Sequence, residues 1–282
     1  MLNKHVYIFV FTSLLFVFSS CEEQIDWEVE QSDAKLVVEA RITTELLRHQ
    51  VRLTKTADYF TKDQPQGVAG ATVSISDGER TITLVETEEG VYEMAEAYAG
   101  EVGKTYTLNI ELIAPIGEET SYTASSKIRK VMQLEDLKVF EESIEDFGEV
   151  FTEYTLSFSG QEIENQVDYF FGEVIINNEL VNEDIQDYIY FNDDLLDGTY
   201  FEEQDIWSTE EELSPEDEIF LKLYSTEKGL EAYIEALQAE VNRDDILGFS
   251  GPPANVKGNI SNNAIGYFYA SDVSVLKAQF VE

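Results

Sequence analysis

The sequence predicts a mainly β protein: an N-terminal Ig-like or transthyretin-like β-sandwich, followed by a second β-rich domain with one α-helix. Short runs of alternating polar and apolar residues recur, with turn residues roughly every 8–12 positions. The pair Asp77-Gly78 joins two such runs, which favours a tight hairpin. Only the segment near 226–242 spaces its apolar residues as a helix does.

We expect two folded domains, at residues 35–130 and 131–282. In the second domain, Asn177-Asn178 reads as a turn between strands. Ser225 or Thr226 is a suitable N-cap for the helix that follows.

The chain begins with the features of a lipoprotein signal peptide. Lys4 provides the positively charged n-region of such a signal. The apolar run from Val6 to Phe18 has the length of a signal h-region and is shorter than the roughly 20 residues of a membrane-spanning helix. Two serines then precede Cys21, the only cysteine in the chain. An ordinary secretory signal with a chance cysteine is the alternative, but the position of the cysteine favours lipidation. We therefore expect residues 1–20 to be the signal peptide and Cys21 to carry the membrane anchor.

The charge of the chain limits its partners. Its 57 acidic and 18 basic residues give a net charge of −39, which excludes binding to nucleic acid through the phosphates. Residues 21–34 form an acidic tether, which would hold the folded part away from an anionic membrane surface. The hydrophobic fraction of 43%, with 17 Phe and 15 Tyr, favours a folded protein.

Several short motifs occur in a characteristic order along the chain. They are the acidic segment after Cys21, Leu36-Val37-Val38-Glu39-Ala40, Val68-Ala69-Gly70-Ala71-Thr72-Val73, Gly90-Val91-Tyr92, Pro252-Pro253, Asn259-Ile260 and Ala264-Ile265-Gly266-Tyr267-Phe268. Together they resemble a family of Bacteroidota lipoproteins, domain-of-unknown-function family 4249, over nearly all of the chain after the signal. The Gly-Ala-x-Val and Gly-x-Tyr patterns also resemble carboxypeptidase-regulatory-like β-sandwiches.

The family resemblance implies an accessory role in the cell envelope. Members of such families are often encoded beside TonB-dependent outer-membrane receptors, so a receptor of this class is the expected partner. The family has no established catalytic residues, and the resemblance therefore assigns none to this chain.

Few residues are available for the common catalytic and metal-binding machineries. After the signal, His49 is the only histidine. A Ser-His-Asp or Cys-His catalytic site could therefore form only through His49, and zinc sites with the usual histidine and cysteine ligands are not available. We expect His49 to be a surface loop residue. Paired carboxylates for glycoside hydrolysis stay open, but 57 acidic residues identify no particular pair.

Calcium is the one metal that the acidic residues suggest. If Gly198 stood at position 6 of an EF-hand loop, Asp193 and Asp197 would stand at positions 1 and 5, but Leu195 and Gln204 would fail at positions 3 and 12. We therefore interpret this stretch as an acidic turn and expect no cofactor. The weaker hypothesis is a calcium site among Asp193, Asp194, Asp197 and Glu202.

Two aromatic clusters are candidates for contact with a ligand or partner. Their exposed members would be drawn from Tyr188, Tyr190, Tyr267 and Tyr269. Alternate residues of a strand face opposite sides, so one face of each cluster packs into a core and only the other is free. Plain sheet packing is the simpler interpretation. The alternative is a stacking platform for a sugar or a partner protein.

These observations predict a non-enzymatic, lipid-anchored binding or accessory protein of the outer membrane, on its cell-surface or periplasmic face. We expect it to contact the membrane through acylated Cys21 and to work with a TonB-dependent receptor. An envelope glycan hydrolase that acts through carboxylates is one alternative function, and a structural adhesin is another.

Overall fold

The computed structural model describes residues 34–57, 65–146, 148–164, 167–194, 198–242 and 256–281. Cys21, with the predicted signal peptide and nearly all of the tether, lies outside the described residues, and its lipidation stays a prediction. Asp33–Glu282 forms one compact unit. The division into two domains near residue 130 therefore also stays a prediction. No helix in the described ranges is long and apolar enough to cross a membrane.

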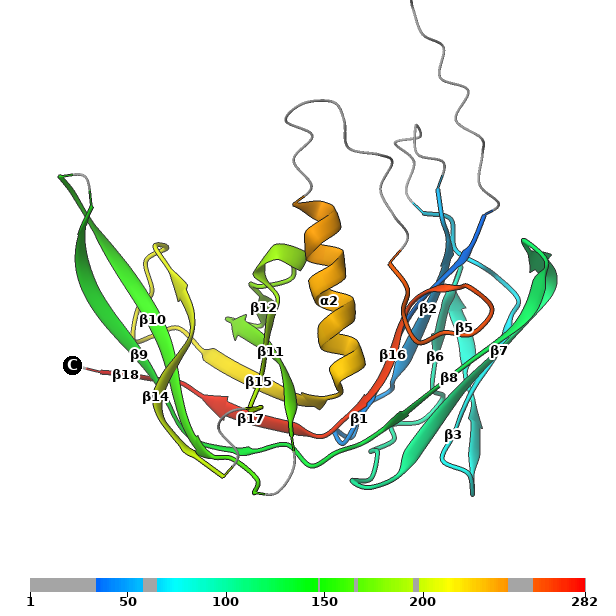
Figure 1. Ribbon diagram of the computed structural model, residues 1–282, viewed down its shortest axis with the longest axis horizontal. Helices are drawn as coiled ribbons and strands as arrows, with labels where there is room; N and C mark the ends of the chain where they lie inside the picture. The colour runs from blue at the N-terminus through cyan, green and yellow to red at the C-terminus, as the bar shows by residue number, and fades with distance from the viewer. Residues whose placement is uncertain are drawn as a thin grey trace, which may run out of the picture. The chain divides into compact units, whose positions relative to one another are not determined.

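The protein is mainly β, as the sequence predicts, and its described strands form four sheets (Figure 1). The first two sheets pack face to face as a sandwich. One sheet has the order β16-β1-β2-β6-β5, with β1 (Leu36–Thr43), β2 (Gln50–Lys55), β5 (Val85–Glu88), β6 (Val91–Glu93) and β16 (Ile265–Ser271). The other has the order β4-β3-β7-β8, with β3 (Thr72–Ser76), β4 (Thr81–Thr83), β7 (Thr105–Ile116) and β8 (Glu119–Lys127).

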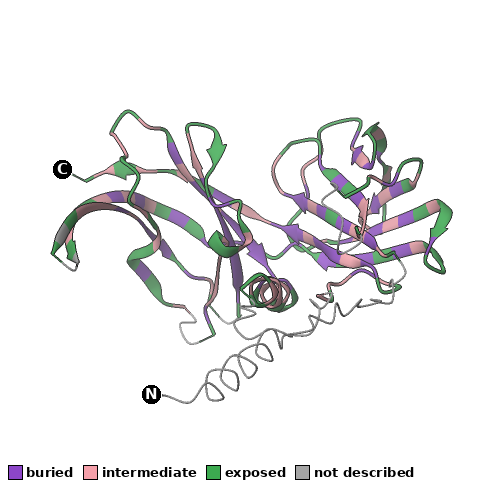
Figure 2. Cartoon of the chain, turned by 90° about the horizontal axis from the view of Figure 1, so that it is seen from above, coloured by how far each residue is buried: buried purple, intermediate pink, exposed green. Residues whose placement is uncertain are grey.

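Alternation along the strands explains how this sandwich forms. Val38 and Leu53 of one sheet and Ile75 and Leu108 of the other are nearly inaccessible and belong to one apolar core. Their neighbours along each strand face away from that core, as the alternating burial colours in Figure 2 show. Burial of one face of each sheet is therefore what holds the two sheets together.

The remaining two sheets enclose a second core. One has the order β14-β10-β9-β18, with β9 (Gln133–Asp146), β10 (Glu149–Gln161), β14 (Tyr200–Thr209) and β18 (Gln279–Phe280). The other has the order β12-β11-β15-β17, with β13 also paired to β11; its strands are β11 (Tyr169–Ile176), β12 (Glu179–Leu180), β13 (Ile189–Asn192), β15 (Ile219–Thr226) and β17 (Val273–Lys277). Leu156 and Phe158 of the first sheet share a core with Phe170 and Leu221 of the second.

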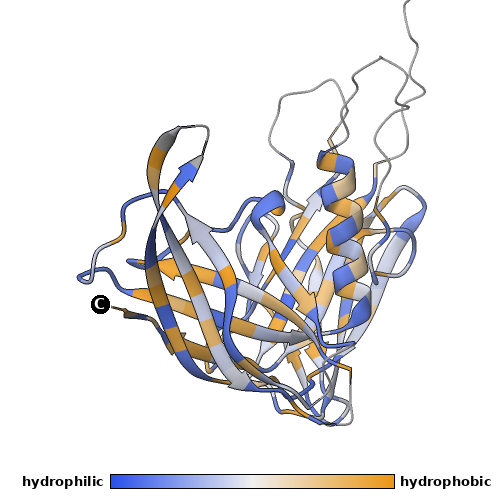
Figure 3. Ribbon diagram, turned by 60° about the vertical axis from the view of Figure 1, so that its left-hand side comes forward, coloured by the Kyte–Doolittle hydropathy of each residue, from blue (hydrophilic) through white to orange (hydrophobic). Residues whose placement is uncertain are grey.

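The described residues contain one α-helix, α2 (Lys228–Val241), where the sequence predicts it. Its start differs from the predicted one: the N-cap residue is Glu227, without a side-chain cap, because Ser225 and Thr226 belong to β15. Ser225 instead donates its hydroxyl to the carbonyl of Arg129. Apolar and polar residues alternate around α2, as Figure 3 shows, and Leu230 and Ile234 form its buried side.

The strands β16 and β17 connect the two sandwiches. β16 lies beside β1 in parallel, with Val38 opposite Gly266 (Figure 1), whereas β17 pairs with β15. Asp272 separates the two strands. Its carboxylate accepts hydrogen bonds from the Thr44 hydroxyl at 2.7 Å and the Val131 amide at 3.1 Å. β16, which is far from β1 in the sequence, thus belongs to the same sheet as β1.

Two predicted turns are confirmed. Asp77-Gly78 lies in the hairpin that joins β3 to β4, where the Asp77 carboxylate accepts the amide of Arg80 at 2.7 Å. Asn177-Asn178 joins β11 to β12, and both residues have positive φ angles of 50° and 69°, which asparagine tolerates.

The expected position of His49 is wrong. His49 is only 2% exposed, and its Nε2 lies 2.9 Å from the Tyr98 carbonyl oxygen. Burial lowers the pKa of the imidazole, so the neutral ring donates this hydrogen bond. His49 is therefore a buried, hydrogen-bonded residue. Sequence reasoning misplaced it because its partner, Tyr98, lies 49 residues further along the chain.

Gly266 provides a test of the β1–β16 junction. Its φ of +104° disfavours any side chain, and a Cβ there would overlap the Val38 carbonyl oxygen. We expect Gly266→Ala to lower the free energy of unfolding by about 3 kcal/mol or more, from backbone strain and overpacking together. Gly78→Ala is the matched control, because Gly78 has a φ of +88° but open space around it, and strain alone costs about 1–2 kcal/mol. Urea denaturation measures both, and equal losses would contradict this account of the junction.

Candidate functional site

A pocket of about 450 Å³ lies among β1, β2, β11, β16 and α2. The alternation of β1 and β16 forms one of its walls. Val38 and Phe268 face the sandwich core, so Arg41 of β1 and Tyr267 and Tyr269 of β16 face the other side. The parallel register places Arg41 directly opposite Tyr269.

Helix α2 and β11 form the facing wall. Leu230 and Ile234 of the helix pack with Phe171 and Tyr267, and Tyr233 lines the pocket one turn along. The Tyr233 and Tyr267 rings lie 5.4 Å apart, within the range of favourable aromatic pairs. Burial raises the pKa of Tyr233 to about 12, so its hydroxyl stays protonated at neutral pH.

Three of the four candidate tyrosines meet in this pocket. Tyr188, which follows the short 3₁₀ helix η2 (Ile185–Asp187), joins Tyr267 and Tyr269 there and packs edge-on against Phe171 at 5.4 Å. Tyr190 does not line it. Its hydroxyl donates to Gln238 of α2 at 2.9 Å, and its ring lines a second cavity of about 420 Å³.

A partly buried ionic network forms the polar end of the pocket. Arg41 Nη1 lies 2.6 Å from Glu173 Oε1, and the Tyr224 hydroxyl donates to Glu173 Oε2 at 2.6 Å. The Arg41 guanidinium also lies over the Tyr224 ring, 5.3 Å from its centroid. The Arg41 side chain nevertheless stays 43% exposed, against 12% for Glu173. Glu173 therefore holds the arginine in place while leaving part of it accessible to a ligand.

A second ion pair lies beside the first. Arg52 of β2 and Glu39 of β1 both line the pocket, and their charged atoms are 3.7 Å apart with more than half of each side chain exposed. At that exposure the pair adds little to stability. It supplies exposed hydrogen-bonding groups to the lining of the pocket instead.

Sequence reasoning missed Arg41, Glu173 and Tyr233. Arg41 occupies a position of β1 that faces away from the sandwich core, which in sequence looks like ordinary surface. Glu173 carried a usable signal, because it is the one charged residue within the otherwise apolar β11. An acid in a strand buried on both faces needs a partner, and that partner is Arg41.

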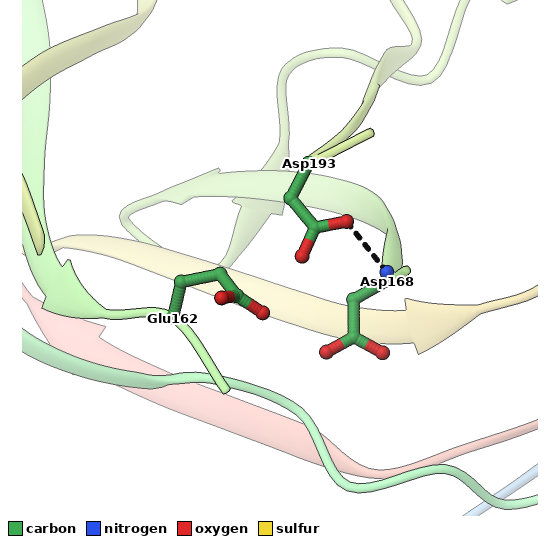
Figure 4. A group of neighbouring side chains, drawn as sticks. All are labelled: Glu162, Asp168 and Asp193. Carbon is green, nitrogen blue, oxygen red and sulfur yellow. Dashed lines mark hydrogen bonds between the residues drawn. The ribbon is translucent and has the colours of Figure 1, made fainter. Parts of the chain in front are cut away.

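The predicted calcium candidates do not come together. Asp194 and Glu202 are exposed, and Asp197 lies outside the described residues. Asp193 is fully buried and has two acidic neighbours that the sequence did not single out, Glu162 and Asp168 (Figure 4). The pKa of Glu162 is raised to about 7, mainly because the carboxyl group is buried and, to a smaller extent, because Asp193 lies close to it.

The Arg41–Glu173–Tyr224 network gives a testable energetic prediction. We expect Tyr224→Phe to lower the free energy of unfolding by about 2 kcal/mol, because it removes a donor from a buried carboxylate. Tyr190→Phe is the matched control: its hydroxyl bonds a neutral amide on a partly exposed side chain, and its loss should cost about 0.5–1 kcal/mol. Urea denaturation of both variants checks the difference, and a Tyr224→Phe loss no larger than that of the control would rule out a strong network.

Comparison with known proteins gives one family and no closer relative. The sequence model described as "Domain of unknown function (DUF4249)" matches residues 22–277. No curated protein and no solved structure matches the chain. Because the matched region includes every strand of both sandwiches up to Lys277, together with α2, the protein belongs to the domain-of-unknown-function family DUF4249 that its motifs predicted.

Proposed function

We propose that the protein is a lipid-anchored binding protein of the cell envelope that holds a ligand in the pocket beside α2. The observation that carries this proposal is the meeting of Tyr188, Tyr267 and Tyr269 with the Arg41–Glu173 pair in one pocket. Its volume of about 450 Å³ falls within the roughly 300–1,000 Å³ of small-molecule sites.

The lining favours a neutral saccharide as the ligand. Tyrosine rings offer flat apolar faces for a sugar ring, with hydroxyl groups at their edges. Gln50 and the two arginine–glutamate pairs add donors and acceptors for sugar hydroxyls. Each arginine already has a glutamate partner, so the charges of the lining are balanced and a neutral ligand fits better than an ionic one.

A glycan hydrolase is the second candidate, because the carboxylates of Glu39 and Glu173 line the same pocket. Each of them is ion-paired with an arginine, at 3.7 Å and 2.6 Å. That arrangement suits the orientation of a ligand more than proton transfer to it, and we therefore favour binding without hydrolysis.

Saccharide binding can be tested with the full-length protein in detergent micelles. We expect a glycan array to identify a neutral saccharide, whose affinity is then measured by calorimetry. Tyr233→Ala should weaken it at least about tenfold, or 1.4 kcal/mol, through the lost stacking surface. Tyr200→Ala should change it less than about twofold, because Tyr200 is an exposed tyrosine of β14 that lines neither cavity.

Three outcomes of this experiment are decisive. Equal losses in the two variants would contradict the assigned site, and an array without any bound saccharide would contradict the ligand class. Release of reducing ends from a bound glycan would replace the binding proposal with the hydrolase.

The anchor and the receptor form the second part of the proposal. Their support is the lipoprotein-like start of the sequence and the motif order shared with the family. We expect the protein, purified from gently solubilised outer membranes of its own cells, to bring a TonB-dependent receptor with it. Cys21→Ala should abolish this co-purification, because the unanchored protein would leave the membrane fraction. Recovery of the lipid-anchored protein without any receptor would contradict a stable complex.

A further inference from the structure

Three acidic side chains converge at one end of the second sandwich. Glu162 directly follows β10, Asp168 directly precedes β11, and Asp193 directly follows β13. The register of β11 with β13 pairs Tyr169 with Asn192, so Asp168 and Asp193 continue the ladder side by side. The Asp168 amide donates to Asp193 Oδ1 at 2.6 Å. One oxygen from each carboxylate lies within 4.8 Å of the others (Figure 4).

The cluster is buried and incompletely satisfied. Glu162 and Asp168 are each 2% exposed, and Asp193 is 0% exposed. Glu162 Oε2 accepts the amide of Gly198, but Glu162 Oε1 and Asp193 Oδ2 have no hydrogen-bond partner among the described residues. The carboxyl groups turn toward a common space, as Figure 4 shows. Buried carboxylate oxygens without a donor are costly, and neighbouring like charges add to that cost.

We propose that Glu162, Asp168 and Asp193 bind one calcium ion. The donors are all carboxylate oxygens, which hard divalent cations prefer and which zinc sites seldom use alone. Two oxygens at roughly 2.3–2.6 Å from one ion can lie up to about 5 Å apart, so the observed spread of oxygens fits calcium. Magnesium usually keeps several of its waters, which suits such a buried cluster less well.

The ion would secure the end of a strand that contacts the helix. Asn192, the residue before Asp193, donates its side-chain amide to Glu231 of α2 at 2.6 Å. Calcium would therefore fix the C-terminal end of β13, which is the end opposite to Tyr188. This inference does not depend on the saccharide proposal, because none of the three acids lines the pocket.

A shared proton is the competing explanation. A single proton between Glu162 and Asp193 would also relieve their repulsion without any metal. The two explanations differ in what the protein takes up, so metal content and calcium-dependent melting separate them.

The test uses the full-length protein in detergent, stripped with EDTA and dialysed against calcium chloride. We expect about one calcium per chain by elemental analysis and a melting temperature raised by about 5 °C at saturating calcium. Asp193→Asn and Glu162→Gln should lose both effects. Asp194→Asn is the matched control, because Asp194 is the adjacent acid but is exposed, and it should behave as the wild type does.

Two results would overturn the proposal. One is a wild-type protein that takes up no calcium. If, in addition, Glu162→Gln melts at a higher temperature than the wild type in EDTA, that result supports the shared proton. The other is uptake that Asp193→Asn and Glu162→Gln retain in full, which would place the ion elsewhere. If either variant fails to fold, the metal content of the wild type and of Asp194→Asn still decides whether calcium binds.

Discussion

The passage of the chain from β16 to β17 is the constraint on which the rest of the structure depends. Asp272 stands between the two strands, and its carboxylate bonds the Thr44 hydroxyl and the Val131 amide, so distant segments meet at one residue. Its backbone also exchanges hydrogen bonds with Ser225. The pocket exists only because β16 lies beside β1 with Tyr267 and Tyr269 turned from the sandwich core toward α2. Pocket-lining residues of β1 and β16, which are far apart in the sequence, are thereby brought onto one wall.

Local signals in the sequence predicted much of this fold, and non-local ones did not. Alternation gave the strands, Asp77-Gly78 gave a hairpin, and apolar spacing gave α2, because each of these depends on neighbours within a few residues. The parallel pairing of β16 with β1 joins Val38 to Gly266, and no local pattern encodes such a partner. The same limit explains His49, whose burial depends on segments that the sequence does not bring near it.

The candidate sites show the same division. Tyr188, Tyr267 and Tyr269 were found because aromatic residues at alternating positions must place some rings outside a core. Which rings line the pocket depends on the tertiary packing: Tyr188 lines both cavities, whereas Tyr190, two residues further along, lines only the second and donates its hydroxyl to Gln238. Asp193 was chosen for its place in an EF-hand pattern that the sequence does not satisfy. Its actual neighbours, Glu162 and Asp168, flank different strands. The register of β11 with β13 brings Asp168 beside Asp193, whereas Glu162 follows β10 of the other sheet and joins them through the packing of the two sheets.

The two proposed sites act on the same short strand. Tyr188 precedes β13 and lines the pocket, whereas Asp193 follows β13 and belongs to the acidic cluster. Tyr190 and Asn192 tie the strand to Gln238 and Glu231 of α2, the helix that forms one wall of the pocket. A cation that orders one end of β13 would also stabilise the position of α2, and with it the wall of the pocket that a ligand would contact. Because such coupling is reciprocal, a ligand in the pocket would raise the affinity for the cation by the same factor.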